Sequence, residues 1–470
     1  MLSSYKYLLK NIGFLTISQF ATKILSFFLV PLYTNVLSAA EYGTYDLFVT
    51  TINLLIPIFT LNVCESIVVY TMDKDCENNQ VISVGIKYSI LGFVGSYIFL
   101  FINYLVKIFP ALNEFWYFFP ILFLLTVINS SFTYFARGID RVKDTAISGV
   151  LSSGILILSN IIFLLIIKIG LLGYFISQIL SLIVQILYLF FSCKIYNYII
   201  WNIDKKTEND MKKFSYPLIA NNIGWWINNS ADRYVVTLIC GIASNGIYSV
   251  GYKIPSILNM FQTIFSQAWT ISAIKDFDSE DKNGFFSNMY SIYNGGMVIV
   301  CSLIIVSSKL LAHILYAKDF FIAWKYVPWL TISIVFGSVS GYLGGIFSAV
   351  KDSKMFGKST IVGAVVNIIL DVILVYAWGS IGAAIATAIS YFVVWIMRFV
   401  HVKKYINFKI NILRDSIAYI ILVIQGGILY IFFDNEVILY SVEIVTFAML
   451  ITFFKNEIKM ITNKLIVYRK

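Results

Sequence analysis

Charged residues, prolines and histidines are scarce in this sequence. Of its 470 residues only 13% are charged, 7 are proline and 2 are histidine, whereas 59% are hydrophobic. A soluble domain has about 25% charged and about 45–50% apolar residues, and a soluble chain of this length would need polar linkers between domains. The apolar segments here follow one another almost without interruption, so the composition excludes a soluble protein.

Patterns typical of metal, disulfide or nucleotide sites are also missing. The five cysteines are scattered without a CxxC pair, and His313 and His401 lie far apart, so neither a disulfide framework nor a metal site is indicated. A Walker-type GxxxxGK[ST] loop does not occur. We therefore expect no enzyme, no metal and no cofactor, apart from a coupling Na⁺ or H⁺.

The sequence does contain a long series of apolar segments. A bilayer core about 30 Å thick needs about 20 mostly apolar helical residues. The first segment is too long for a signal peptide, and we interpret it as an uncleaved span. We predict an all-α integral membrane protein with about fourteen transmembrane helices, near residues 12–37, 43–71, 81–106, 115–136, 145–167, 170–193, 214–240, 245–272, 286–308, 328–350, 356–378, 380–400, 412–433 and 437–454.

The distribution of lysine and arginine orients these spans. With both termini in the cytoplasm, most of the 35 basic residues fall in inside segments, as the positive-inside rule requires. Five fall in outside loops: Lys107, Lys168, Lys309, Lys318 and Lys325. The net charge of +10 is thus explained by topology, and we expect no nucleic-acid partner. Four basic residues remain within spans: Lys23, Lys87, Arg233 and Lys253.

Similar sequences recur at offsets of roughly 200–210 residues, which indicates an internal repeat. Spans 1–6 match spans 7–12 in the same orientation, an arrangement found in transporters. We predict an N-terminal lobe over 1–193, a cytoplasmic linker over 194–213 and a C-terminal lobe over 214–404. Residues 405–470, with spans 13 and 14, lie outside the repeat.

The polar residues within spans 1, 2, 7 and 8 predict a central cavity. A charged side chain in mid-bilayer costs about 2.5–3.5 kcal/mol on insertion scales, so it usually faces a cavity or a partner. Ammonium and guanidinium groups bind phosphate or pyrophosphate oxygens well. The predicted cavity residues are Lys23, Arg233, Lys253, Gln19, Asn229, Asn53 and Asn259.

The alternative interpretation of these charges is structural. Arg233 would pair with Asp232 or Glu65, and Lys23 and Lys87 would extend toward the membrane surface. Neighbouring residues on a helix point about 100° apart, so Asp232 and Arg233 do not easily face one partner. Asp232, Glu65 and Asp371 are candidates for binding a coupling cation or proton, and a hydrogen-bonded buried carboxyl is an equally good interpretation of Asp371.

Two motifs stand in and beside the polar spans. The first is NSADRYVV at 229–236 with NGIYSVGYK at 245–253, and the second is PLYTNVLS at 31–38 with EYG at 41–43. Both motifs resemble the polysaccharide-exporter flippases of the multidrug/oligosaccharidyl-lipid/polysaccharide exporter superfamily. The resemblance implies a V-shaped, two-lobe exporter fold. It also implies alternating access, driven by an ion gradient or the membrane potential, that moves undecaprenyl-pyrophosphate-linked oligosaccharide repeat units to the outer leaflet.

This resemblance also implies a pathway and a membrane, and it leaves several alternative functions to compare. The glycan would serve O-antigen, lipopolysaccharide, capsule or exopolysaccharide assembly at the bacterial cytoplasmic (inner) membrane, beside membrane lipids, a polymerase and other glycan-assembly proteins. A lipid II flippase would use the same cavity. A multidrug extruder would need an acidic cavity, and an O-antigen polymerase or ligase would need a large external catalytic loop, whereas the longest outside loop predicted here is about 309–327.

Overall fold

The computed structural model describes residues 27–460 apart from 74, 276, 351 and 433. Every regular element in this part of the chain is helical. The chain divides into two compact units, Met1–Ser230 and Ala231–Lys470, and helix α10 (Lys205–Cys240) contributes to both. The predicted boundaries near 193, 213 and 404 stay predictions.

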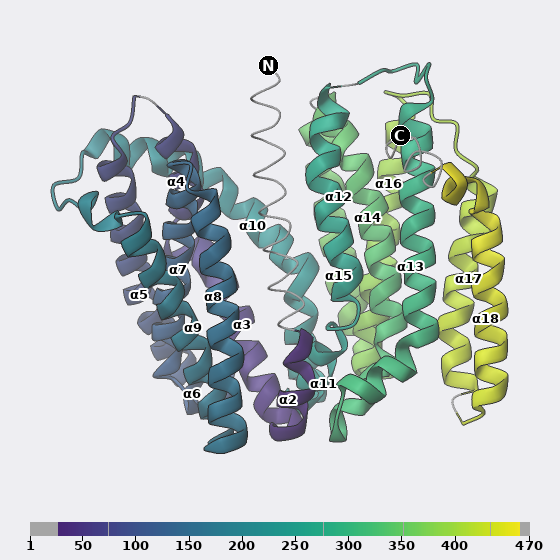
Figure 1. The fold of residues 1–470 in the computed structure, drawn as a ribbon, viewed down its shortest axis with the longest axis horizontal. Helices are drawn as coiled ribbons and strands as arrows, with labels where there is room; N and C mark the ends of the chain where they lie inside the picture. Colours follow the sequence, from purple (N-terminus) through teal and green to yellow (C-terminus); the bar gives the residue numbers. More distant parts are fainter. Residues whose placement is uncertain (1–26, 74, 276, 351, 433, 461–470) are drawn as a thin grey trace. The chain divides into compact units, whose positions relative to one another are not determined.

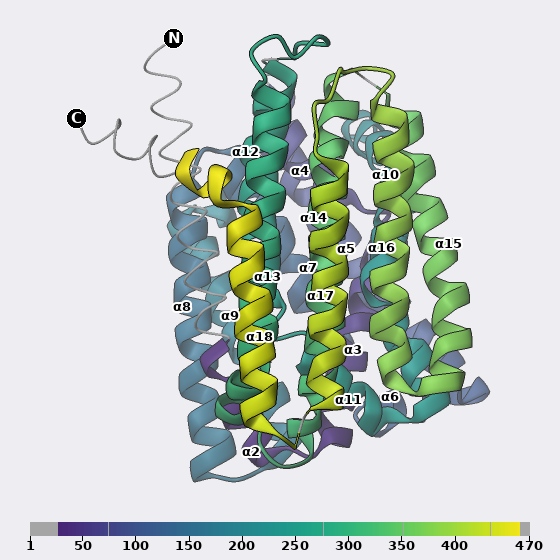
Figure 2. The same cartoon turned by 90° about the vertical axis from the view of Figure 1, so that its right-hand side faces the viewer.

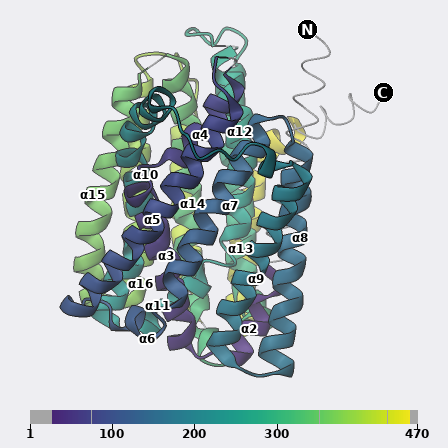
Figure 3. The same ribbon diagram turned by 90° about the vertical axis from the view of Figure 1, so that its left-hand side faces the viewer.

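In unit 1, α5, α7, α8 and α9 run side by side along most of their length (Figure 3). Helix α4 packs on α5 and α7. The elements are α2 (Val30–Val36), α3 (Ala39–Phe59), α4 (Val63–Met72), α5 (Asn78–Val106), α6 (Pro110–Glu114), α7 (Phe118–Gly138), α8 (Val142–Asn160), the π-helical η1 (Ile161–Ile166), α9 (Gly170–Ser192) and the 3₁₀ turn η2 (Ile195–Asn197).

Unit 2 is built around α14, which contacts α12, α13 and α16, while α17 and α18 pack on α13 (Figures 1 and 2). Within the apolar stretch of α14 89% of the residues are buried, compared with 17% in α18. After α10 the elements are α11 (Ile242–Gly251), α12 (Ser256–Lys275), α13 (Phe285–Leu315), the 3₁₀ helix η3 (Lys318–Lys325), α14 (Val327–Ala349), α15 (Ser353–Trp378), α16 (Ser380–Val402), α17 (Ile412–Ile431) and α18 (Glu436–Phe453).

Local sequence signals explain several of these boundaries. Ser38 starts α3 with a capping box, because its hydroxyl accepts from the Glu41 N–H while the Glu41 carboxylate accepts from the Ser38 N–H at 2.8 Å. This gives the EYG motif a structural role. After Pro57, Leu61 and Asn62 adopt positive φ angles of 49° and 56°, and α3 and α4 meet at a bend of 60°.

The predicted spans compare closely with the observed helices. In the described part of the chain, ten helices are long and apolar enough to cross a membrane, or eleven if α3 and α4 form one bent span. The protein is therefore an all-helical, multi-pass membrane protein. The first predicted span lies mostly outside the described residues. The seventh and eighth coincide with α10 and with α11 plus α12, which do not pass the same test of length and apolarity.

One predicted loop is largely helical. Helix α13 extends to Leu315 and η3 follows at once, so much of the segment predicted as the longest outside loop, 309–327, is helical. The reason is that Lys309 does not end the helix: its side chain is buried and its ammonium donates to Glu436 at 3.0 Å. A basic residue that is neutralised in this way can remain inside a helical packing interface.

Candidate functional site

A cluster of ionisable side chains lies in unit 2 where α10 meets α11. Asp232 on α10 is 2% exposed, and its Oδ2 accepts hydrogen bonds from the Tyr248 hydroxyl at 2.6 Å and the Tyr252 hydroxyl at 2.8 Å. Tyr248 and Tyr252 are four residues apart, so they share one helical face. Their two hydroxyl groups therefore converge on a single carboxylate oxygen.

Arg233 uses the same tyrosine in a different way. Its guanidinium carbon lies 5.3 Å from the centre of the Tyr252 ring, a cation–π distance, and its backbone N–H donates to Asp232 Oδ1 at 2.9 Å. Although Asp232 and Arg233 point in different directions along α10, Tyr252 serves both, because its hydroxyl meets the carboxylate and its ring lies under the guanidinium. The expectation that the two residues do not easily share a partner is thus wrong.

The turn after α11 explains the glycine in the YSVGY segment. A Cβ at Gly251 would lie 3.0 Å from the Tyr326 ring, and Tyr326 in turn packs edge-on against Tyr248, with ring centres 5.4 Å apart. A side chain at 251 would therefore displace the ring that supports Tyr248. Lys253 follows in the turn toward α12, half-buried, with its N–H donating to the Val250 carbonyl.

A second carboxyl faces this cluster from α15. Asp371 is fully buried and lies close enough to interact electrostatically with Asp232 and Tyr248. Asn367, one turn earlier, is also buried. Among the described residues, neither oxygen of Asp371 has a hydrogen-bond partner, nor has the amide nitrogen of Asn367. Two carboxyls so placed in low dielectric favour the binding of a cation or a proton between them. In the described part of the chain no group of three or more acidic, histidine or cysteine residues could hold a metal ion.

The polar cluster of unit 1 lies at the bend between α3 and α4. The Asn222 amide on α10 donates to Asn62 Oδ1 at 3.1 Å and to Glu65 Oε1 at 2.8 Å. One turn later, the Trp226 indole donates to the Thr50 carbonyl at 2.9 Å. The first part of α10 is thus fastened to the bent span of its own unit.

An ion pair joins the start of α10 to α5. The Lys87 ammonium lies 2.8 Å from Glu208 Oε2, and the Tyr88 hydroxyl donates to Glu208 Oε1 at 2.9 Å. The hydrogen bond from Lys87 lowers the pKa of Glu208 below its ordinary value of 4.5. Lys87, half-exposed with a side-chain exposure of 43%, therefore forms an ion pair on α5.

The structure brings together only some of the predicted site residues. Asp232, Arg233 and Asp371 cluster in unit 2, and Glu65 joins Asn222 and Asn62 in unit 1. Asn53, Asn229 and Asn259 lie exposed on α3, α10 and α12, and the Asn229 amide donates to the Trp225 carbonyl of its own helix. Lys23 and Gln19 lie outside the described residues.

The sequence analysis missed the hydrogen-bond donors of both clusters. Tyr248 and Tyr252 stand in the very motif that carried the resemblance, four residues apart on one face of the chain. Their hydroxyl groups could have been proposed as partners for the nearby Asp232. Nothing in the sequence, in contrast, indicated that Asn222 would bridge two residues about 160 positions earlier.

Comparisons with known proteins agree with this architecture. A probable low-salt glycan biosynthesis flippase, Agl15 of Haloferax volcanii, is 22% identical over 232 residues, which is 48% of each chain. An uncharacterised membrane protein of Methanocaldococcus jannaschii, MJ1375, is 28% identical over 210 residues, or 44% of this chain and 49% of the relative. The chain thus spans about half the length of these relatives in each match.

Solved structures share the fold across nearly the whole chain. The lipid II flippase MurJ in an inward closed conformation has a TM-score of 0.72 at 15% identity, covering 94% of this chain and 99% of MurJ. An inward-facing multidrug resistance MATE transporter has a TM-score of 0.66 at 15% identity, covering 86% and 95%. The predicted exporter fold is confirmed. Residues 8–274, more than half of the chain, match the model of the polysaccharide biosynthesis protein family, and the chain belongs to that family.

Proposed function

We propose that this protein is a flippase that moves a lipid-linked oligosaccharide from the cytoplasmic to the outer leaflet of a membrane. Family membership and the exporter fold support transport over catalysis. The observation that carries the proposal is the placement of Arg233, whose guanidinium is held on the Tyr252 ring within a membrane protein. A guanidinium fixed in this way is suited to bidentate binding of pyrophosphate oxygens.

The substrate is proposed more narrowly as an undecaprenyl-pyrophosphate-linked repeat unit for O-antigen, capsule or another exopolysaccharide. Arg233, with Lys253 and Lys23, would bind the pyrophosphate, while Gln19, Asn53, Asn229 and Asn259 would offer hydrogen bonds to sugar hydroxyls. Membrane lipids would surround the polyprenyl tail, and a polymerase would receive the exported unit.

The proposed setting is the cytoplasmic membrane of a bacterium, with both termini on the cytoplasmic side. This orientation rests on the distribution of lysine and arginine between the two sides. A membrane potential that is negative inside favours the outward movement of an anionic substrate.

Energy coupling is proposed for the Asp232–Asp371 pair of unit 2. Binding of Na⁺ or H⁺ would relieve the repulsion between the two buried carboxyls, and its release would restore it. Because Asp232 also holds Tyr252, which underlies Arg233, the ion and the substrate anion would act on neighbouring groups of one cluster. Two ligands that act on one cluster in this way would be energetically coupled.

The test uses a strain that lacks its own repeat-unit flippase. Arg233→Ala should reduce surface glycan by at least about tenfold, because one charge-assisted contact contributes roughly 1.5–3 kcal/mol, while Arg233→Lys retains part of the activity. The matched control is Lys403→Ala, since exposed Lys403 also lies over an aromatic ring, with its ammonium 4.8 Å from the centre of Phe399.

Immunoblots of membranes must show equal amounts of each variant. Normal glycan export by Arg233→Ala would refute the proposed role of the cluster. Rescue of a strain depleted of its lipid II flippase, without any rescue of repeat-unit export, would assign the protein to peptidoglycan precursors, the rival that the same cavity chemistry allows.

A further inference from the structure

Helix α18 carries a buried carboxyl that the proposed transport site does not use. Glu443 is 0% exposed, although α18 is among the least buried of the apolar helices. It lies seven residues inside the start of α18, a helix that packs on both α17 and α13. Ionisable residues at such positions are costly in a membrane and mark functional sites.

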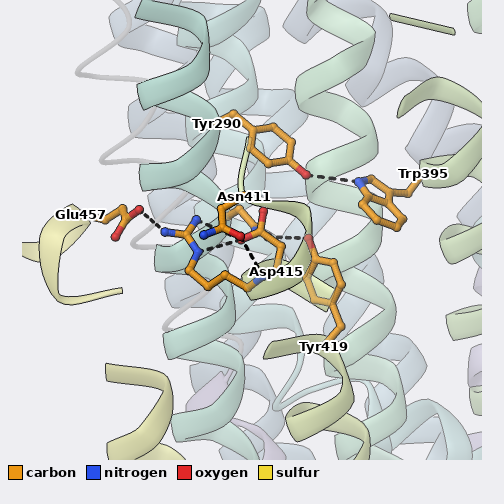
Figure 4. Close-up of polar contacts among 8 residues, drawn as sticks. Tyr290, Trp395, Asn411, Asp415, Tyr419 and Glu457 are labelled. Carbon is orange, nitrogen blue, oxygen red and sulfur yellow. Dashed lines mark hydrogen bonds and ion pairs between the residues drawn. The ribbon is translucent and has the colours of Figure 1, made fainter. Parts of the chain in front are cut away.

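Three other acidic residues of this helical hairpin have basic partners. Arg414 binds Asp415 at 2.9 Å and also binds Glu457 (Figure 4), and Glu436 binds Lys309 at 3.0 Å. Glu443 differs, because neither of its carboxyl oxygens has a hydrogen-bond partner in the described part of the chain. Basic side chains thus pair with the carboxylates near the ends of the hairpin. Among the described residues, Glu443, which lies between those ends, has no such basic partner.

The neighbour of Glu443 is an amide on α17. Gln425 is 0% exposed and lies beside the Glu443 carboxyl, and its Nε2 donates to Thr446 Oγ1 at 3.0 Å. The Thr446 hydroxyl donates to the backbone carbonyls of Val442 and Glu443, so its hydrogen is already committed. Among the residues that the structure describes, no donor within hydrogen-bond geometry reaches three buried acceptor oxygens: Glu443 Oε1, Glu443 Oε2 and Gln425 Oε1.

Charged and titratable groups on the surrounding helices do not supply that donor. Lys309 on α13 binds Glu436, which is two helical turns or about 10 Å from Glu443, and α14 contains no charged residue. Among the described residues, none of the titratable side chains on the elements packed here forms a hydrogen bond or ion pair with Glu443. They are Tyr290, Tyr293, Cys301, Lys309 and His313 on α13, Tyr342 on α14, Arg414, Asp415, Tyr419 and Tyr430 on α17, and Glu436 and Tyr440 on α18.

We propose that Glu443 is a proton-binding site, and that the bound proton holds α17 and α18 together. The carboxylate takes up one proton from water and becomes a neutral carboxylic acid, whose single O–H can donate to Gln425 Oε1. Neutralisation removes the cost of an isolated buried charge. A proton suits the site better than a hard metal cation, which takes about six oxygen ligands, because the oxygens without a donor here number three.

This site is independent of the proposed glycan transport and can be tested without it. Infrared spectra of the full-length protein in lipid nanodiscs at neutral pH should contain the carbonyl band of one protonated carboxyl that Glu443→Gln removes. The matched control is Glu436→Gln, which removes an exposed, ion-paired carboxylate of the same helix and should leave that band intact. As the pH rises from mildly acidic to neutral, thermal stability should fall in the wild type, because the folded state then has to release the proton, and it should fall less in Glu443→Gln.

Identical carbonyl bands in wild type and Glu443→Gln would show an ionised Glu443 and overturn the proposal. So would a stability profile that follows sodium concentration instead of pH. If Glu443→Gln does not fold, Gln425→Leu provides the test, because loss of the amide acceptor should shift the Glu443 carbonyl band. An unshifted spectrum in that variant would also refute the site.

Discussion

Each unit contains a break between two consecutive helices. Different polar side chains stabilise the two breaks. In unit 1 the chain bends by 60° between α3 and α4, through Leu61 and Asn62 in left-handed conformation. In unit 2 it turns between α11 and α12, through residues 252–255, which end at Pro255. Helix α10 supplies the polar contact to both interruptions.

In unit 1 this contact is made by the Asn222 amide, which donates to Asn62 Oδ1 and to Glu65 Oε1. The contact in unit 2 is a buried carboxylate that accepts from two tyrosines, with Arg233 on one of their rings and Asp371 nearby. An amide donor keeps its hydrogens at any ordinary pH, whereas a pair of carboxyls responds to cations and protons. We therefore propose that the contact in unit 1 fixes geometry and that the contact in unit 2 takes part in ion coupling.

The largest expected effect follows from removing charge in unit 2. Asp371→Asn should reduce ion-driven transport by about 5–150-fold, the range of typical coupling energies, because it abolishes the carboxyl pair with Asp232. Glu65→Gln should change transport far less, since glutamine retains an oxygen that can accept from Asn222. The measurement is glycan translocation in proteoliposomes with an imposed Na⁺ or H⁺ gradient.

The gradient that drives wild-type transport also identifies the coupling ion. Equal losses of glycan transport in Asp371→Asn and Glu65→Gln would contradict the proposal that the coupling ion acts in unit 2. Equal transport by Asp371→Asn and wild type under both gradients would exclude the Asp232–Asp371 pair as the coupling site.

A smaller effect, on stability, is expected from unit 1. Asn222→Leu removes the donor of two hydrogen bonds and should destabilise the protein by roughly 1–3 kcal/mol, the cost of leaving a partly buried acceptor unsatisfied. Asn221→Leu, at the exposed neighbouring position of α10, is the matched control. Thermal unfolding in detergent measures both, and equal melting temperatures for the two variants would contradict the fastening role of Asn222.

The smallest effect concerns the ion pair at the start of α10. Because Lys87 lowers the pKa of Glu208, the folded state binds this proton less readily than the unfolded state. The resulting stabilisation is present above about pH 4.5, the ordinary value of the group, and is lost as the pH falls below it. It should amount to less than about 1 kcal/mol, since water screens the half-exposed Lys87.

Unfolding curves of wild type and Glu208→Gln should therefore converge at acidic pH. A difference between the two proteins that persists unchanged below pH 4.5 would assign the effect to packing instead of charge.

Most helices could be predicted because a bilayer demands long apolar segments, and such segments are visible in the sequence. Helix α13 continues past the predicted span end near 308, because Glu436 neutralises Lys309 from a position 127 residues away. Glu443 and Gln425 were not predicted as a site because their spans, 13 and 14, lie outside the internal repeat on which the predicted cavity rested.

The candidate site was predicted in part. Asp232, Arg233 and Asp371 were identified because charges inside apolar segments are conspicuous, but the sequence offered no reason to join Asp371 on α15 to Asp232 on α10. The two contacts of Tyr252 could not be predicted from the sequence. Its hydroxyl donates to Asp232 and its ring lies under Arg233, and both contacts depend on the angle between two helices.

By itself, the sequence determined that this is a helical membrane protein of the exporter type and which residues carry charge into its spans, because hydrophobicity and insertion costs act on short segments. Tertiary structure alone decided which charges meet. Ion pairs and hydrogen bonds form between side chains that are distant along the chain and whose separation is set by helix packing. The grouping of Asp232 with Tyr248, Tyr252 and Asp371, and the unpartnered burial of Glu443, are properties of that packing.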